Sequence, residues 1–462
     1  MIRTAIILLL FCSSFYPLGA APTNRPNVLL IAVDDLNHWV GHLGRNAQVK
    51  TPNIDRLARK GMTFTRAYCA APVCNPSRTA LMSGMRPSTT GVYDNAIDFR
   101  PHVAPEQTLN SHFRNHGYFV AGAGKIYHGG GGRLNEWDDY MRGGAGEPKG
   151  KLEDRSAGPI KFGVLDCDDS ELGDYRIASW IIDQLKREHA KPFFLACGFH
   201  KPHMPWNVPR KYYDMYPLES IRLPPSLTND LSDVPPAGVR MAHAFGDHAR
   251  VVEAGKWKQA IQGYLAAISF LDAQVGRVLD ALEKSPHANT TIICFSGDHG
   301  WHLGEKEHWR KFALWEEATR APFIWVAPGV TKPGGRCERT VDFMSIYPTL
   351  CELAALPVPK HVEGTGISNL LSNPHAEWAK PALTTHGFAN HAVRSERWRF
   401  IRYTDGGEEL YDHLYDPYEW TNVASRTELS NVKSGLAKAF PSKNTPAPEP
   451  SPRRNNGARP PP

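Results

Sequence analysis

The sequence predicts an α/β fold in which helices sandwich a mostly parallel central sheet, followed by a small antiparallel sheet. Three observations support this prediction. Apolar runs without period-two alternation recur along the chain, amphipathic helical stretches separate them, and the pattern changes near residue 375. With 41% apolar and 22% charged residues among 462, the composition is that of a soluble globular protein. It excludes a disordered chain, a collagen-like fibre and a polytopic membrane protein.

Residues 1–21 predict a secretory signal peptide. Arg3 gives a basic start, residues 5–11 form an unbroken apolar run, and Gly19 and Ala21 are the small residues that a signal peptidase requires. The apolar run is too short to span a bilayer about 30 Å thick as a mature helix. We therefore expect an exported protein, periplasmic or extracellular, without a stable membrane association.

The central sheet is predicted from short, β-branched apolar runs that are typical of strands buried on both faces. These runs occupy residues 27–33, 193–197, 291–295 and 323–327. Apolar spacings of three and four predict helices over residues 261–282 and 342–356. In sheets of this kind ligands bind beyond the carboxyl ends of the strands, so we expect the functional residues there.

The chain divides into a catalytic domain over residues 22–375, a carboxyl-terminal subdomain over 376–440 and a tail over 441–462. The subdomain contains short strand-like pieces at 392–395, 397–403 and 409–411. The tail is rich in proline and basic residues, and we expect it to be disordered. Two stretches rich in glycine and proline, near 129–160 and 204–250, are expected to be loops, and loops of this length are usually functional.

The net charge is +6, but the signal and the tail carry most of it. The charge therefore does not indicate a broad surface for binding nucleic acid. The nearly neutral body predicts that any anionic substrate meets a local positive pocket and that no nucleic acid is bound.

Seven cysteines remain after the signal, too few for a disulfide scaffold in a chain of this length. Cys197 and Cys294 lie in apolar runs and are expected to be buried. The sequence leaves open whether Cys337 pairs with Cys351.

Acidic residues follow two of the predicted strands. Asp34 and Asp35 come directly after residues 27–33, and Asp298 and His299 come just after residues 291–295. Each pair alone is equally typical of a turn or a helix cap. Together, however, three carboxylates at two strand ends would repel one another unless a cation holds them. The pattern therefore predicts a site for a hard metal ion.

A third motif runs Cys74-Asn75-Pro76-Ser77-Arg78 and is followed by a helical pattern that begins after Pro76. A cysteine at a helix amino terminus is favoured as an anion by the macrodipole. The alternative is a structural cysteine in a loop.

These motifs resemble those of a known family. C-x-P-S-R followed by x-A-L-x-S-G is similar to the signature of the type I, formylglycine-dependent sulfatases of the alkaline-phosphatase-like superfamily. N-V-L-L-I-x-x-D-D-L and G-D-H-G occur in the order and spacing of that family, and the resemblance covers nearly all of residues 26–425. F-F-L-A-x-G-x-H-K-P-H-x-P and G-D-H-G-W-x-L-G-E bring it closer to the iduronate 2-sulfatase branch.

The resemblance implies that Cys74 is oxidised to formylglycine by a formylglycine-generating enzyme that recognises Pro76 and Arg78. One hydroxyl of the hydrated aldehyde would attack sulfur, and the second would later expel sulfate. Arg78 would hold this diol. The resemblance also implies one Ca²⁺ per subunit, held by Asp34, Asp35, Cys74, Asp298 and His299. His299 stands where other members carry asparagine.

The resemblance further assigns Lys125 to the diol and sulfate and His128 to the base for sulfate release. His203 would contact the leaving oxygen as a general acid, and Lys311 would be the second sulfate lysine, with Arg310 as the alternative on spacing. From charge alone, a solvated loop is the better explanation of Lys125 and His128. A sulfate monoester needs fixed positive groups around its oxygens and a proton donor at the leaving oxygen.

These residues predict a sulfuric ester hydrolase that acts on a sulfated saccharide. The alternatives are a phosphodiesterase or phosphonate hydrolase of the same superfamily, and an inactive sugar-binding homologue. Asn95, Trp206 and Trp301 are candidates for the wall of the substrate pocket, although core or surface packing is the commoner role of such residues.

Overall fold

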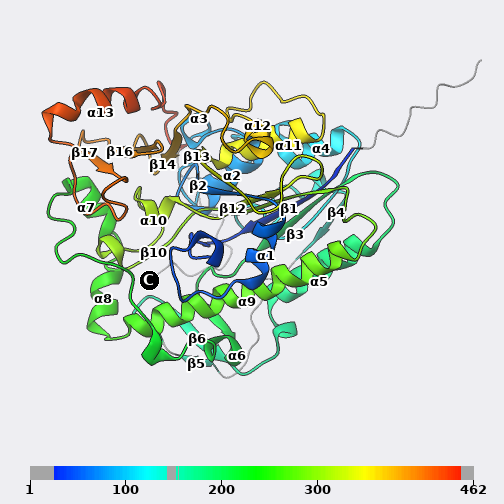
Figure 1. Ribbon diagram of the computed structural model, residues 1–462, viewed down its shortest axis with the longest axis horizontal. Coiled ribbons are helices and arrows are strands. Elements are labelled where there is room, and N and C mark those ends of the chain that lie inside the picture. Colours follow the sequence, from blue (N-terminus) through cyan, green and yellow to red (C-terminus); the bar gives the residue numbers. More distant parts are fainter. Residues whose placement is uncertain (1–24, 143–151, 155, 449–462) are drawn as a thin grey trace, which may run out of the picture.

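The computed structural model describes residues 25–142, 152–154 and 156–448. The expected signal peptide and residues 449–462 of the expected tail lie outside the described residues. The centre of the fold is an eight-stranded sheet of order β13-β2-β12-β9-β1-β7-β3-β4 (Figure 1). Its strands are β1 (Asn27–Val33), β2 (Met62–Tyr68), β3 (Phe119–Gly124), β4 (Asp139–Met141), β7 (Phe193–Phe199), β9 (Thr291–Gly297), β12 (Phe323–Val326) and β13 (Gly335–Asp342).

The predicted mostly parallel sheet is confirmed. β1 pairs in parallel with both β7 and β9, and β3 pairs in parallel with β4 and β7. β12 is the exception, because it runs antiparallel to both β9 and β2. All seven residues of β1 are buried, as its lack of alternation predicted.

Helices cover both faces of this sheet, and each face has its own hydrophobic core. On one face α1 (Pro52–Lys60), α5 (Gly173–Lys186) and α9 (Trp257–Glu283) pack over Leu29 and Ile31. On the other face α2 (Cys74–Ser83), α4 (Leu109–Asn115), α11 (Ile346–Leu353) and α12 (Ser368–Ser372) pack over Val28 and Leu30. The alternating side chains of β1 therefore enter opposite cores.

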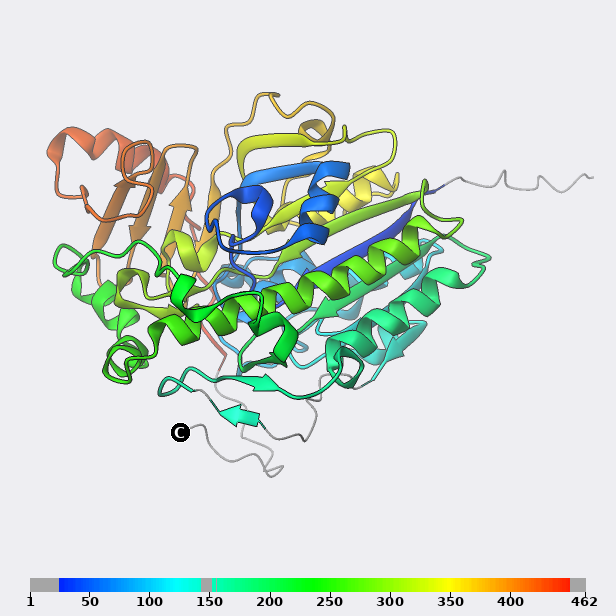
Figure 2. The ribbon, with the colours of Figure 1, turned by 60° about the horizontal axis from the view of Figure 1, so that its bottom comes forward.

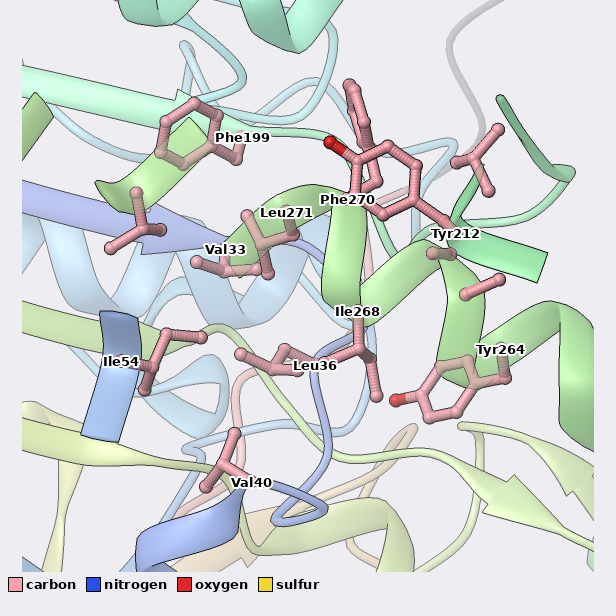
Figure 3. Packing of buried hydrophobic residues seen from close by; sticks show 14 of the residues in the cluster. Val33, Leu36, Val40, Ile54, Phe199, Tyr212, Tyr264, Ile268, Phe270 and Leu271 are labelled. Carbon is pink, nitrogen blue, oxygen red and sulfur yellow. The ribbon is translucent and has the colours of Figure 1, made fainter. Parts of the chain in front are cut away.

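The long helix α9 runs along the sheet (Figure 2) and includes the predicted helix over 261–282. Figure 3 shows its residues Tyr264, Ile268 and Leu271 near Val33 and Leu36, at the carboxyl end of β1. The helix predicted over 342–356 begins instead as a 3₁₀ turn (Phe343–Ser345) and continues as the shorter α11.

The two stretches expected to be loops contain more regular structure than predicted. Short elements hold them to the body, and these are β5 (Leu152–Asp154), β6 (Phe162–Leu165), β8 (Trp206–Pro209), α6 (Arg210–Tyr213), α7 (Pro236–Ala242) and α8 (Asp247–Glu253). β6 pairs with β8 in parallel. The spacing of apolar residues could not reveal these elements, because each is too short to show a repeating pattern.

The carboxyl-terminal subdomain is a four-stranded antiparallel sheet beside the main sheet, at the left of Figure 1. Its strands are β14 (Ala382–Thr385), β15 (His391–Arg394), β16 (Trp398–Arg402) and β17 (Glu408–Asp412), and α13 (Ser430–Ala437) follows them. The sequence indicated the last three strands and missed β14. The remaining short elements are α3 (Pro87–Thr90), α10 (Glu316–Thr319), β10 (His302–Leu303), β11 (Trp309–Arg310) and eight 3₁₀ turns among the described residues, including Glu305–Glu307.

Within residues 441–448, the part of the expected tail that the structure describes, Thr445 is hydrogen-bonded to the catalytic domain. The amide of Thr445 donates to the carbonyl oxygen of Ser88 at 2.8 Å, and the hydroxyl of Tyr93 donates to the carbonyl oxygen of Thr445 at 2.8 Å. The cysteines of the described chain, Cys337 and Cys351 among them, are free, so that possible pair does not form here. Cys197 and Cys294 are buried as predicted. Among the described residues, no helix has the length and apolar character to cross a membrane.

Candidate active site

The candidate site lies beyond the carboxyl ends of β1 and β9. The parallel register pairs Val33 with Gly297, so the residues that follow the two strands emerge side by side. The amide of Asp298 donates to the carbonyl oxygen of Val33 at 2.9 Å, and the amide of Asp35 donates to Asp298 Oδ1 at 3.1 Å. The carboxylates of Asp34, Asp35 and Asp298 are all buried. The structure thus brings together the three acids that the sequence placed at two strand ends.

The nucleophile candidate, Cys74, is the first residue of α2, although the helix was predicted to begin only after Pro76. Its side chain is fully buried. The neighbouring Asn75 fixes the turn, because its side chain donates to the carbonyl oxygens of Asp94 at 2.9 Å and Ile97 at 2.7 Å. The Asn75 amide in turn donates to Asn95 Oδ1 at 2.9 Å.

Arg78 lies one turn further along α2 and joins the acids to the helix. Its Nε donates to Asp298 Oδ2 at 2.9 Å, and its Nη2 lies 3.4 Å from Asp34 Oδ1. The Nη1 group donates to the carbonyl oxygens of Lys125 and Ile126. With only 1% of its surface exposed, the guanidinium is a fixed part of the site rather than a mobile surface group.

Two lysines complete the positive groups. Lys125 follows β3, and its Nζ donates to Asp34 Oδ2 at 2.5 Å. Lys311 Nζ donates to Asp35 Oδ1 at 2.6 Å and lies 2.9 Å from Cys74 Sγ. The sequence left Lys311 and Arg310 as alternatives, and here Lys311 enters the site while Arg310 pairs with Asp247 at 2.5 Å.

The segment that carries Lys311 has an unusual backbone. Arg310 and Phe312, on either side of it, have φ angles of 73° and 69°. The φ angles of Lys306 and Glu307 are also positive, at 55° and 48°. Such angles are uncommon for residues other than glycine and persist only where the surroundings enforce them. Strain of this kind is concentrated at functional sites.

Three histidines surround this group at different depths. His299 Nε2 lies 3.5 Å from Cys74 Sγ and 3.5 Å from Asp35 Oδ1, and its ring is fully buried. His203 Nε2 lies 3.8 Å from Asp35 Oδ2, and 40% of its side chain is exposed. His128 is exposed, and in the described part of the chain no hydrogen bond joins its ring to another side chain.

The orientation of His203 follows from one contact. Its Nδ1 lies 2.6 Å from the carbonyl oxygen of Met204. A carbonyl oxygen only accepts, so Nδ1 carries the proton of this bond and Nε2 is the atom that faces the acids. The ring is therefore fixed with its reactive nitrogen toward the site.

Burial and charge shift the acids and the thiol in different directions. Burial raises the pKa of the Cys74 thiol to about 12, with a further contribution from Asp34. Burial also acts to raise the pKa of Asp34, but the charges of Lys125, His203 and Arg78 outweigh it and hold that pKa well below its usual range. Burial raises the pKa of Asp298 despite His299 and Arg78 beside it. For His128, desolvation and the charge of Lys125 lower the pKa to about 4.

The donor atoms fit a hard divalent cation. Oxygen, sulfur and nitrogen atoms of Asp34, Cys74, Asp298 and His299 all lie within 4.8 Å of one another, and so do those of Asp34, Asp35, Cys74 and His203. The Oδ2 atom of Asp35 is buried without a hydrogen-bond partner, 3.8 Å from His203 Nε2, so this carboxylate oxygen is available to a cation. Carboxylate-rich sites of this kind suit calcium, although the imidazole is an unusual ligand for it.

The sequence missed two residues that hold the site. The hydroxyl of Tyr264 in α9 donates to the carbonyl oxygen of Asp35 at 2.7 Å, and Ser77 Oγ donates to the carbonyl oxygen of Asp298 at 2.5 Å. Ser77 lies within the quoted motif, but Tyr264 is 229 positions away from its partner, so no local signal could reveal it. The tryptophan candidates for the pocket wall, Trp206 and Trp301, are core residues with 0% and 2% exposure.

Comparison with known proteins finds sulfatase families and sulfatases that match most of the chain. The profile of the family described as Sulfatase matches residues 26–356, and that described as N-sulphoglucosamine sulphohydrolase, C-terminal, matches residues 304–445. A sulfatase of Formosa agariphila is 39% identical over 443 residues, covering 91% of this chain and 87% of its own. The iduronate 2-sulfatase of Mus musculus is 33% identical over 394 residues, covering 74% and 71%.

Among solved structures, the phosphonate monoester hydrolase of Agrobacterium radiobacter is similar with a TM-score of 0.76 and 21% identity. The similarity covers 90% of this chain and 94% of that one. At this level of identity the likeness concerns the fold, which is the alkaline-phosphatase-like architecture that the sequence predicted.

Proposed function

The chain belongs to the sulfatase family and is a sulfuric ester hydrolase, and we propose that it removes ester sulfate from a sugar of a sulfated polysaccharide. The observation that carries the proposal is the meeting of Cys74 with Lys311, Lys125 and the three acids in one buried cluster. A relative whose name specifies iduronate, 33% identical to this chain, supports a sugar as the substrate.

We propose that Cys74 is converted to formylglycine by a modifying enzyme that recognises Pro76 and Arg78. In its hydrated form this residue supplies an oxygen nucleophile and a second hydroxyl for the release of sulfate. The position of Cys74 Sγ supports this role, because two positive or hydrogen-bonding groups, Lys311 Nζ and His299 Nε2, lie within 3.5 Å of it.

One Ca²⁺ would be held by Asp34, Asp35, Asp298, His299 and residue 74, and when bound it supplies positive charge to a sulfate oxygen. The partnerless oxygen of Asp35 supports this assignment. Metal analysis of the purified protein, with sulfate release measured after chelation and after calcium is restored, tests it. Full activity without metal would contradict it.

Positively charged side chains of the protein would also stabilise the negative charge of the sulfate ester. A sulfate monoester carries one negative charge, and its leaving oxygen gains charge in the transition state. Lys125 and Lys311 are placed to bind the sulfate oxygens. Arg78 would act as a positioning residue, because its guanidinium makes four hydrogen bonds, to Asp34, to Asp298 and to two backbone carbonyl oxygens.

Two histidines would handle protons. As the imidazolium, which carries a proton on each nitrogen, His203 would protonate the leaving oxygen from Nε2, since its Nδ1 proton is already committed to the Met204 carbonyl oxygen. His128 would accept a proton when sulfate is released. This assignment is supported by the place of His128 three residues after Lys125, in the motif Gly124-Lys125-Ile126-Tyr127-His128.

We propose that the protein acts outside the cytoplasm, on the strength of the signal-like pattern of residues 1–21. Sulfate release from a panel of defined sulfated mono- and disaccharides tests the proposed function. The matched comparison is an aryl sulfate against an aryl phosphate diester, because a related fold is found in a phosphonate hydrolase. Faster turnover of the diester, or no release from any saccharide, would overturn the proposal.

A further inference from the structure

Two phenylalanine rings stand beside the candidate site without a role in the chemistry described above. The ring of Phe312 is next to Lys311, whose Nζ lies 5.7 Å from its centre and 2.9 Å from Cys74 Sγ. The ring of Phe245 lies 5.2 Å from Phe312 with the two planes tilted by 50°. Three successive contacts, through Lys311 and Phe312, thus lead from the position of Cys74 to Phe245.

The exposure of these rings differs. Phe312 is half-buried, whereas Phe245 exposes 45% of its surface and belongs to none of the hydrophobic cores. A single exposed phenylalanine is common on protein surfaces and needs no explanation. Here the exposed ring extends a second ring at the edge of a catalytic cluster, and that arrangement is typical of a ligand-binding wall.

The Phe245 segment is fixed to the strained segment that carries Lys311. Arg310 pairs with Asp247 at 2.5 Å, and the Arg310 guanidinium lies 5.3 Å from the centre of the Phe245 ring. The ring of His308 lies between carbonyl oxygens, 2.8 Å from that of Ala242 and 2.5 Å from that of Lys311. The loop between α7 and α8 and the segment of Lys311 therefore form one rigid unit.

The carboxyl-terminal subdomain also contacts Phe312. His386, at the turn between β14 and β15, has its ring 6.3 Å from that of Phe312. The backbone of Phe312 is bound as well, because its amide donates to the carbonyl oxygen of Pro72, just before Cys74. With φ at 69°, Phe312 has a backbone conformation that is uncommon for a residue other than glycine and that its surroundings must enforce.

We propose that Phe245, backed by Phe312, is a stacking platform for the sugar ring that carries the scissile sulfate. A pyranose presents an apolar face of C–H groups, which an aromatic ring binds while its hydroxyls remain free for hydrogen bonds. The Arg310 guanidinium, which lies over one face of the Phe245 ring, adds a positive charge that suits an anionic saccharide bound at the exposed part of that ring. The proposal rests on the proposed function, since it assigns the specificity of that same site.

The test measures sulfate release from the saccharide that wild type hydrolyses fastest, using Phe245→Ala, Phe245→Trp and the control Tyr415→Ala. Tyr415 is also an exposed aromatic residue, 79% exposed, in the turn after β17. We expect Phe245→Ala to raise KM about fivefold to tenfold, with the loss in KM rather than kcat, and Phe245→Trp to restore KM to within about twofold. Tyr415→Ala should leave KM at its wild-type value.

Inhibition by inorganic sulfate separates a platform from a general disturbance, because sulfate has no ring to stack. A Phe245→Ala enzyme with wild-type KM, or one whose sulfate inhibition constant rises in parallel with KM, would overturn the platform while leaving the sulfatase function intact. If wild type releases sulfate from no saccharide, the proposed function fails, and the platform fails with it.

Discussion

The ammonium group of Lys311 lies 2.9 Å from the sulfur of Cys74, although 237 positions separate the two residues in the chain. The same ammonium donates to Asp35 Oδ1 at 2.6 Å. One side chain therefore connects the nucleophile position on α2 with the acids at the end of β1. Burial opposes its charge, but the nearby Asp35 and Cys74 outweigh burial and raise the pKa of Lys311 above its usual range. The group stays charged where a sulfate oxygen would need it.

Replacing Lys311 with methionine should reduce kcat/KM for a sulfate ester by about 10²–10³, the usual cost of removing one preorganised donor to the transition state. Methionine keeps most of the volume of the stem, so the folded state should survive. Steady-state sulfate release measures the effect. The control is Lys360→Met, an exposed lysine that should leave the rate unchanged. A Lys311→Met enzyme within threefold of wild type would contradict the role.

Replacing Cys74 with alanine should abolish sulfate release, because no other side chain in the cluster can supply the nucleophile. Peptide mass mapping of active wild-type protein should find the mass of an aldehyde or its hydrate at that position. Cys167→Ala is the matched control, since Cys167 is a free and only partly buried cysteine. Active protein with an unmodified thiol at position 74 would exclude the formylglycine mechanism.

Replacing His203 with alanine should lower kcat/KM more for sulfate esters with poor leaving groups than for those with good ones. Its Nε2 faces the site, so its removal takes away the proton donor that an alkyl alcohol needs. A plot of log kcat/KM against leaving-group pKa should become steeper in the variant. His200→Gln is the control, because His200 pairs with Asp174 instead of the site acids. Parallel plots for wild type and His203→Ala would remove the general-acid assignment.

A buried ion network should dominate the stability of the contact between the subdomain and the catalytic domain. Arg399 is fully buried, and it pairs with Glu419 and, at 2.6 Å, with Glu316. The ligand atoms of Glu316, His413 and Glu419 are close enough to hold a metal, but the Arg399 guanidinium already neutralises them. Arg399→Met should lower the free energy of unfolding by about 3–5 kcal/mol, because two carboxylates lose their buried partner.

The comparison for this prediction is Arg397→Met. Arg397 pairs with Asp412 at 2.6 Å, but 48% of its side chain is exposed, so its loss should cost about 0–1 kcal/mol. Urea unfolding of both variants measures the difference. Equal costs would mean that the buried network contributes no more than a surface pair.

Asp272 should make stability depend on pH between about 4 and 6. It accepts the amides of Asn53 at 3.0 Å and Ile54 at 2.8 Å and so caps α1 from α9, while burial raises its pKa to about 6. The folded state then holds a proton that the unfolded state has lost. Stability from this group is fully present below the unfolded pKa and falls as pH rises through the folded pKa, by up to ~3 kcal/mol.

Asp272→Asn removes this titration. We therefore expect the stability of the variant relative to wild type to improve as pH rises from 4 to 7, measured by urea unfolding at several pH values. Asp280→Asn is the control in the same helix, because the Asp280 side chain is 52% exposed. A difference that is flat with pH, or that falls as pH rises, would show that the pKa of Asp272 is not raised.

The sequence predicted those helices and strands that depend only on the order of neighbouring residues. The uninterrupted apolar run of residues 27–33 predicted a strand buried on both faces, and the stripe over 261–282 predicted the core of α9. It did not predict that β12 runs antiparallel to its neighbours, because strand direction depends on the path of the connections and not on the apolar pattern. Short elements such as β14 and α8 were missed for lack of a repeat to detect.

The same division holds for the candidate site. The sequence by itself determined which residues are available, since Asp34, Asp298, Cys74 and the lysines stand in motifs that can be read one at a time. Only the tertiary structure decided that Lys311 rather than Arg310 enters the cluster, and that Tyr264 and Arg78 hold it. The physical reason is that these choices are made by contacts between distant segments, by burial and by an enforced backbone conformation at Arg310 and Phe312, none of which leaves a trace in local residue order.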